Sequence, residues 1–179
     1  MDRPSWGRDP VPPPCYAPRV TRTLFAISDV HLHHKDNRDI AASYRPDGPD
    51  DWLIVAGDVS HDAEHIVGFL ALMRERFARV LWVPGNHDLW SRSEDPLRGE
   101  DRYFDLVERL RARDVTTPED AYPLWDDIAV APLFVLYDYS LRPVGLSKQQ
   151  AFAKAAAARV ICNDEALLSP TPYTSREDW

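Results

Sequence analysis

The sequence predicts an α/β fold with a parallel βαβαβ core followed by further strands. Three short apolar segments occur in the first half of the chain, and segments with helical periodicity lie between and after them. Each apolar segment stops at small or acidic residues, which is typical of a buried strand that runs into a loop. The 179 residues, 44% of them apolar, also suffice for one domain with its own core.

The predicted core strands cover residues 23–27, 52–56 and 80–83. Their side chains are apolar without the alternation of a half-exposed strand, so both faces of each strand are expected to be buried. The first segment ends at Ser28-Asp29, the second at Gly57-Asp58 and the third at Pro84-Gly85-Asn86.

Two helices are expected around the third strand. In residues 62–79 the apolar side chains recur at helical spacing, at Ile66, Phe69, Leu70, Met73 and Phe77. Asp62 stands near the start of this helix, where an acidic residue is favourable. In residues 101–113 the side chains expected to face inward are Tyr103, Phe104, Val107 and Leu110. Helical crossovers of this kind join parallel strands.

The second half of the chain is less regular. Residues 128–132 and 133–137 are predicted to be strands, with Pro132 at the break between them. The alanine-rich residues 148–160 favour a helix. Residues 36–44 are predicted to be a loop with a short helix.

The N-terminal segment differs in composition from the rest. Residues 1–20 contain six prolines among polar residues and predict a mobile tail, and residues 21–179 form the predicted domain. The N-terminus lacks the basic-then-apolar pattern of a signal peptide, so a cytoplasmic location is expected. No apolar run reaches the roughly eighteen residues of a membrane span, so no membrane partner is expected.

Charge and cysteine content narrow the function. The chain has 21 basic and 29 acidic side chains, a net charge of -8, which disfavours binding to nucleic acids and anionic membranes. Its two cysteines, Cys15 and Cys162, are far apart and form neither a disulfide framework nor a CxxC metal site.

Polar residues at the ends of the three predicted strands are the candidate functional residues of this chain. Asp58 follows Asp29 by 29 residues and Asn86 follows Asp58 by 28, so each interval fits one strand and its crossover. These residues are therefore expected side by side at the carboxyl edge of one sheet, where ligand sites form. Together with His31 they offer carboxylate, imidazole and amide donors, which suit a divalent metal ion. Each residue alone fits a turn or helix cap, but three such turns in register favour a site.

The three motifs resemble the first three motifs of the calcineurin-like metallophosphoesterases; they are Asp29-Val-His31, Gly57-Asp58 and Gly85-Asn86-His87-Asp88. The resemblance implies a metallophosphoesterase-type α/β sandwich, of which this chain holds the N-terminal portion. It also implies two divalent metal ions, with Mn, Fe or Zn as candidates. Asp29 and His31 would bind one ion, Asp58 would bridge both, and Asn86 would bind the second.

Two further residues take roles from the same resemblance. His87 corresponds to the histidine that contacts the phosphoryl group and protonates the leaving oxygen, and Asp88 would orient the His87 ring. The implied activity is hydrolysis of a phosphomonoester or phosphodiester by a hydroxide that the two metal ions activate.

Longer stretches are similar to an actinobacterial, phosphopantetheinyl hydrolase-like branch of that family. They are residues 36–38, 50–59, 82–87, 136–140 and 167–170. This similarity implies release of 4′-phosphopantetheine from a carrier protein, so an acyl carrier protein is a candidate partner besides the phosphate ester itself.

The other four histidines are weaker candidates for residues of the site. His33 and His34 are expected in a solvated loop, with the alternative that one of them lines the mouth of the site. His61 is expected to be a neighbour of a helix cap rather than a ligand, and His65 to lie on a helix surface.

The chain departs from the family pattern after His87. The pattern continues with three more histidines, whereas all six histidines of this chain lie between positions 31 and 87. The second metal site is therefore expected to be incomplete. Three explanations stay open: the chain is a fragment of a longer enzyme, it needs a second chain for activity, or it is a non-catalytic relative with a binding or regulatory role.

Overall fold

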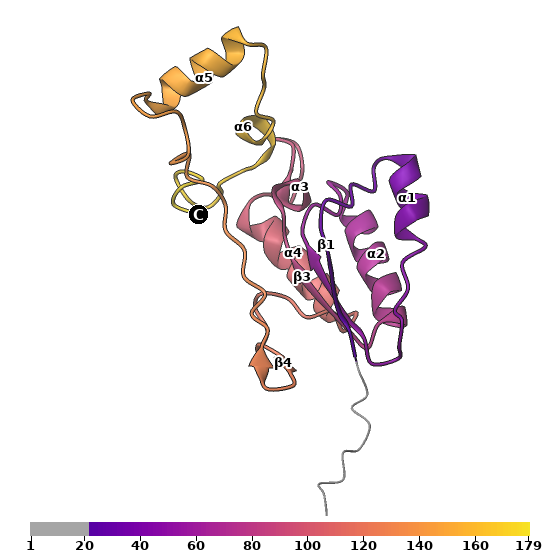
Figure 1. The fold of residues 1–179 in the computed structure, drawn as a ribbon. Coiled ribbons are helices and arrows are strands. Elements are labelled where there is room, and N and C mark those ends of the chain that lie inside the picture. The colour runs from indigo at the N-terminus through magenta and orange to yellow at the C-terminus, as the bar shows by residue number, and fades with distance from the viewer. Residues whose placement is uncertain (1–21) are drawn as a thin grey trace, which may run out of the picture.

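A parallel sheet with strand order β1-β2-β3 lies at the centre of the computed structural model, which describes residues 22–179 (Figure 1). The strands are β1 (Leu24–Ile27), β2 (Trp52–Ala56) and β3 (Arg79–Val83). Leu24 pairs with Trp52, and Trp52 with Arg79. The three predicted parallel strands are thereby confirmed. The predicted tail, residues 1–20, lies outside the described residues.

Helices follow each strand. They are α1 (Lys35–Ala41), α2 (Ala63–Arg76), α3 (Asn86–Leu89) and α4 (Glu100–Arg111). As predicted, α2 starts beside Asp62, whose carboxylate accepts a hydrogen bond from the Glu64 N–H at 2.8 Å. α2 packs against β3 and α4, and its buried residues Ile66, Leu70 and Met73 form the centre of the core.

One inward-facing residue of α4 was predicted wrongly. Phe104 is 42% exposed, and Leu106 takes its place in the core beside Tyr103, Val107 and Leu110. Successive residues of an α-helix are rotated by about 100°, so position 104 falls outside the narrow stripe that these four side chains share.

The two strands predicted at residues 128–137 are largely wrong. Residues 128–129 form β5 (Ile128–Ala129), which pairs only with β4 (Leu124–Trp125) in an antiparallel hairpin. Residues 133–137 pair with no strand of the described chain. Their side chains nevertheless alternate: Phe134 packs against the core, whereas Val135 is 91% exposed. The continuous apolar run predicts a strand, but a strand also needs a hydrogen-bonded neighbour.

The predicted helix at residues 148–160 is confirmed as α5 (Lys148–Ala157), which buries none of its residues and stands apart from the sheet in Figure 1. Ser147 and Gln150 form a capping box at its start. The unpredicted helix α6 (Asp164–Leu167) follows, and Asp164 and Leu168 are nearly buried. Within residues 22–179, every helix is too short or too polar to cross a membrane.

The loops after β2 and β3 approach each other at two glycines. Gly57 has a φ of +80°, and a Cβ atom there would lie 2.7 Å from the Gly85 Cα. A Cβ atom on Gly85 would lie 2.6 Å from the Asp58 backbone nitrogen and would also collide with the Asp58 carboxylate. Only glycine therefore lets the two backbones meet.

Gly85→Ala is expected to lower the free energy of unfolding by about 1–3 kcal/mol, because the added methyl group overpacks a contact with backbone atoms. Gly68→Ala is the matched control. A Cβ atom on Gly68, within α2, meets no atom within 4 Å, so this variant should gain about 0.5–1 kcal/mol from helix propensity. Urea unfolding followed by circular dichroism measures both; equal effects of the two substitutions would contradict the close approach.

Candidate metal centre

The loops after β1 and β2 bring three predicted ligand residues together. Asp29, His31 and Asp58 each offer one ligand atom, and these atoms all lie within 4.8 Å of one another. His31 Nε2 lies 3.7 Å from an Asp29 carboxylate oxygen. The cluster sits at the carboxyl edge of the sheet, as the spacing of the motifs predicts.

Backbone hydrogen bonds extend the parallel pairing beyond the strand ends. The Asp29 N–H donates to the Gly57 carbonyl at 3.3 Å, and the His31 N–H donates to the Asp58 carbonyl at 3.0 Å. The two ligand-bearing loops are therefore held in register by the same kind of bonding that holds the sheet.

The backbone at all three residues adopts left-handed conformations. The φ angles are +55° at Asp29, +45° at His31 and +54° at Asp58. Such angles are uncommon for residues other than glycine and are found preferentially at functional sites, where the surrounding structure maintains them. Their concentration in this cluster supports a binding role.

Asn86, the fourth predicted ligand, opens α3 beside the cluster. Its Nδ2 group donates a hydrogen bond of 2.8 Å to the Asp164 carboxylate. Since that amide group is engaged, the amide oxygen Oδ1 is the atom that Asn86 can offer to a cation.

His87 lies between two aromatic neighbours. Its ring stacks on Trp90, with 3.7 Å between ring centroids, and meets the His31 ring edge-on at 4.7 Å. Its backbone N–H donates to the Asp58 carboxylate at 3.1 Å. Burial lowers the pKa of the His87 imidazole, and the nearby Asp58 charge acts in the opposite direction. The His87 Nδ1 atom is buried and has no hydrogen-bond partner within the described chain.

Asp88 has partners other than the predicted one. Its carboxylate is fully buried and accepts hydrogen bonds from the backbone N–H groups of Val59 at 2.8 Å, Ser60 at 3.1 Å and Gly85 at 3.1 Å. No hydrogen bond to the His87 ring accompanies them. The prediction that Asp88 orients this ring is corrected accordingly: Asp88 joins the loops after β2 and β3. Burial raises its pKa to about 7, although the three N–H groups favour the charged form.

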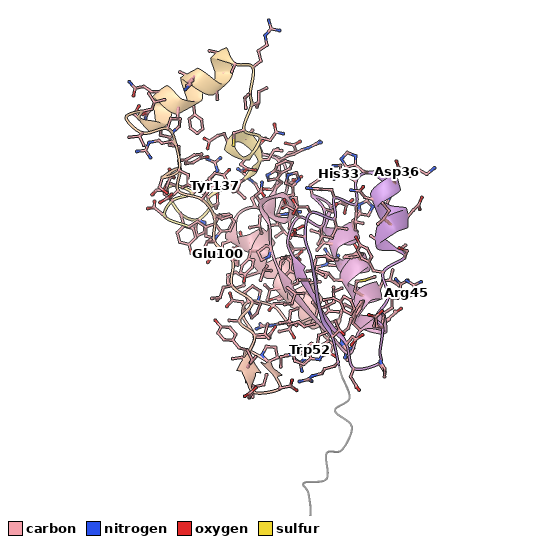
Figure 2. All side chains as sticks on the ribbon, viewed as in Figure 1. His33, Asp36, Arg45, Trp52, Glu100 and Tyr137 are labelled. Atoms are coloured by element: carbon pink, nitrogen blue, oxygen red, sulfur yellow. The ribbon has the colours of Figure 1, made fainter. Side chains whose placement is uncertain are left out.

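Three further histidine rings gather next to His31 and His87. The His33 ring lies 4.0 Å from that of His34, 5.2 Å from that of His61 and 6.5 Å from that of His87. Figure 2 shows His33 next to Asp36 in α1, at the end of the sheet opposite Trp52. His33, His34 and His61 are all exposed, so the open alternative of a histidine-lined mouth fits this arrangement. His65 instead lines a groove between α1 and α2.

Asp164 is a member of the site that the motifs do not reveal. It is 6% exposed, and its carboxylate accepts hydrogen bonds from Asn86, the Trp90 indole N–H and the Tyr137 hydroxyl. It lies 78 positions from Asn86 in a segment without strand or helix periodicity. No local pattern in the sequence points to it.

The donor set fits a divalent cation. Two carboxylates and one imidazole converge in the cluster, and no thiolate takes part. Asn86, at the start of α3, adds an amide oxygen to the donors that the neighbouring loop offers. Such sets suit metals of intermediate hardness, including Mn, Fe and Zn. The described residues provide three clustered ligands for one ion, but only Asp58 and Asn86 for a second.

Comparison with known proteins agrees with this geometry. A model of the calcineurin-like phosphoesterase family matches residues 22–155. Over 164 residues the chain is 46% identical to the [acyl-carrier-protein] phosphodiesterase PptH of Mycobacterium tuberculosis (strain ATCC 25618 / H37Rv), a match that covers 88% of this chain and 51% of the relative.

The fold is similar to the crystal structure of the phosphopantetheinyl hydrolase PptH from M. tuberculosis, with a TM-score of 0.83 and 45% sequence identity. This match covers 88% of the present chain and 59% of that structure, so the chain spans between half and two thirds of the proteins it matches. On the family match and the shared fold, the chain belongs to the calcineurin-like phosphoesterase family.

Proposed function

We propose that the chain is a metal-dependent hydrolase of phosphate esters, with the phosphodiester that links 4′-phosphopantetheine to an acyl carrier protein as its substrate. The convergence of Asp29, His31 and Asp58 at the sheet edge carries this proposal. The name of the M. tuberculosis relative, an [acyl-carrier-protein] phosphodiesterase, supports the choice of substrate.

Asp29 and His31 would hold one divalent ion, Asp58 would be shared, and Asn86 would serve a second ion. Mn, Fe and Zn are the candidates. When bound, divalent ions in such sites polarise phosphoryl oxygens and lower the pKa of water. The backbone pairing of the two loops keeps Asp29, His31 and Asp58 in position before any ligand arrives.

His87 is the proposed proton donor. Stacking on Trp90 and the edge contact with His31 fix the plane of its ring. The departing alkoxide would take its proton from the His87 imidazole, which removes the cost of expelling a strong base.

The alternative is a relative that binds its ligand without turnover or that needs a second chain. Within the described residues, only Asp58 and Asn86 are available to a second ion, and this observation favours the alternative. Turnover separates the two: the 179-residue chain, loaded with Mn²⁺, should release 4′-phosphopantetheine from a holo carrier protein, as detected by mass spectrometry. Mn²⁺ binding without release would favour the alternative.

Asp58→Asn is expected to weaken Mn²⁺ binding at least about 10-fold, because the substitution removes a negatively charged ligand from the centre of the cluster. Isothermal titration of the metal-free chain with Mn²⁺ measures this effect. The matched control is Asp39→Asn, which removes the same charge from an exposed position in α1. Equal affinities of Asp58→Asn and the unaltered chain would contradict the role of Asp58.

His87→Asn is expected to lower kcat by about 100- to 10,000-fold on an alkyl phosphodiester, since an alkoxide leaving group needs a proton. The decrease should be much smaller on bis(p-nitrophenyl) phosphate, because p-nitrophenolate leaves without one. His65→Asn, which alters a histidine in the groove between α1 and α2, serves as control. A similar decrease on both esters would argue against proton donation by His87.

A further inference from the structure

The Asp164 carboxylate connects three side chains around the candidate metal centre. One of its oxygens accepts hydrogen bonds from Asn86 Nδ2, at 2.8 Å, and from the Trp90 indole N–H. The other accepts a hydrogen bond from the Tyr137 hydroxyl. Asp164 is only 6% exposed, so these donors replace most of the water that a carboxylate would otherwise bind.

Two of the three donors are linked to the proposed reaction, one as a candidate metal ligand and the other through its contact with His87. Asn86 is the candidate ligand of the second ion. Trp90 carries the His87 ring on its face, at 3.7 Å between centroids and an interplanar angle of 26°. A change in the Trp90 plane would therefore move the proposed proton donor.

We propose that Asp164 is a positioning residue that fixes the orientation of the Asn86 amide toward the metal and of the Trp90 indole beneath His87. This inference rests on the proposed function. An asparagine amide can present either its oxygen or its NH₂ group to a neighbour, and only the oxygen binds a cation. A carboxylate can only accept hydrogen bonds, so it selects the rotamer with Nδ2 toward Asp164 and Oδ1 free.

Asp164 itself is poorly placed to be a ligand. Three donors occupy its two oxygens, and it does not belong to the close group of Asp29, His31 and Asp58. Outer partners of this kind orient ligands and affect metal affinity without touching the ion.

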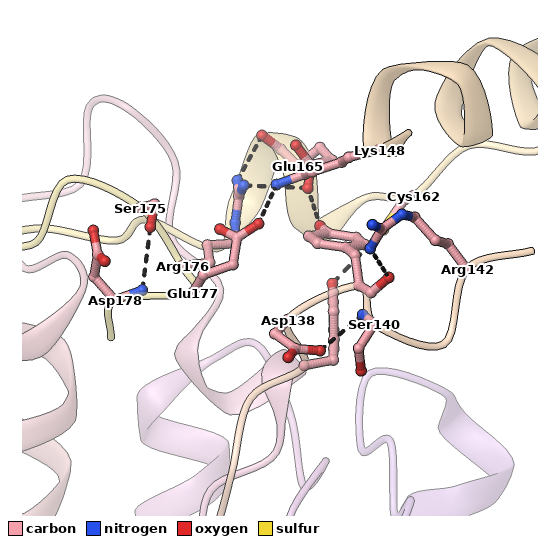
Figure 3. A network of polar contacts seen from close by, with 12 residues as sticks. Asp138, Ser140, Arg142, Lys148, Cys162, Glu165, Ser175, Arg176, Glu177 and Asp178 are labelled. Atoms are coloured by element: carbon pink, nitrogen blue, oxygen red, sulfur yellow. Dashed lines mark hydrogen bonds and ion pairs between the residues drawn. The ribbon is translucent and has the colours of Figure 1, made fainter. Parts of the chain in front are cut away.

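The position of α6 does not depend on Asp164 alone. The neighbouring Glu165 accepts a hydrogen bond from the Tyr139 hydroxyl and pairs with Arg176 at 3.2 Å. Arg176 also donates to the carbonyls of Leu168 and Glu165, each at 2.8 Å. Figure 3 shows this Glu165–Arg176 contact. A variant of Glu165 therefore serves as a matched control, because it tests whether Asp164 acts only by holding α6 in place.

The test is a double-mutant cycle on the affinity for the second Mn²⁺ ion, the one assigned to Asn86, measured by isothermal titration of the 179-residue chain. Asp164→Ala should weaken binding about 10- to 100-fold, as loss of an outer partner does. In an Asn86→Ala background the same substitution should cause little further loss, because the residue through which Asp164 acts is gone. Equal losses in both backgrounds would overturn the proposal.

A conservative variant of Asp164 and a variant of its neighbour Glu165 distinguish the positioning of Asn86 and Trp90 from the docking of α6. Asp164→Asn retains an oxygen for Asn86 and Trp90 and should bind Mn²⁺ more tightly than Asp164→Ala. Glu165→Ala, which removes an anchor of α6, should leave affinity near that of the unaltered chain. A loss in Glu165→Ala as large as in Asp164→Ala would show that only the docking of α6 matters, and would overturn the proposal.

A metal-free readout comes from NMR of the side-chain amides. The Asn86 NH₂ resonances are assigned by their absence in Asn86→Ala. In the unaltered chain these protons should exchange slowly with water, and in Asp164→Ala they should exchange rapidly. Unchanged exchange would refute the contact. If the unaltered chain binds no Mn²⁺, the proposed function and this inference fail together; if Asp58→Asn removes binding and Asp164→Ala does not alter it, this inference alone fails.

Discussion

The buried carboxylate of Asp88 is the interaction on which the rest of the site depends. It accepts hydrogen bonds from backbone N–H groups on both sides of the gap between the loops after β2 and β3. When Asp88 is ionised these bonds are charge-assisted and stronger than neutral ones, and they satisfy N–H groups that lie beyond the regular sheet. The contact between Gly57 and Gly85 follows from the same closure, because no side chain separates the two backbones.

The joining of the loops after β2 and β3 determines where the candidate site residues lie. With the loops joined, the Asp58 carboxylate reaches the His87 backbone N–H, and Asp58 lies between the residues that follow β1 and those that follow β3. The left-handed backbone at Asp29, His31 and Asp58 costs free energy that the surrounding hydrogen bonds must offset. Loops that are joined by hydrogen bonds in this way suit a metal site, since the ligands need little reorganisation when an ion binds.

The elements with local signals were predictable. The apolar segments of β1, β2 and β3 and the periodic stripe of α2 depend on neighbouring residues only, and the structure contains all of them. Residues 133–137 form an equally continuous apolar run but have no strand partner among residues 22–179. Sheet formation there requires a second segment, and an apolar run within one segment cannot supply it.

The sequence by itself determined that Asp29, His31, Asp58 and Asn86 meet at one edge of a sheet, because the lengths of the strands and crossovers between them are nearly equal. Only the tertiary structure decided that Asp88 joins the two loops and that Asp164 holds Asn86 and Trp90. Hydrogen bonds between side chains 74 and 78 positions apart leave no periodic trace in a sequence. These hydrogen bonds depend on how the chain packs. Polar side chains need a partner within the protein only when packing removes them from water, so folding decides which groups pair.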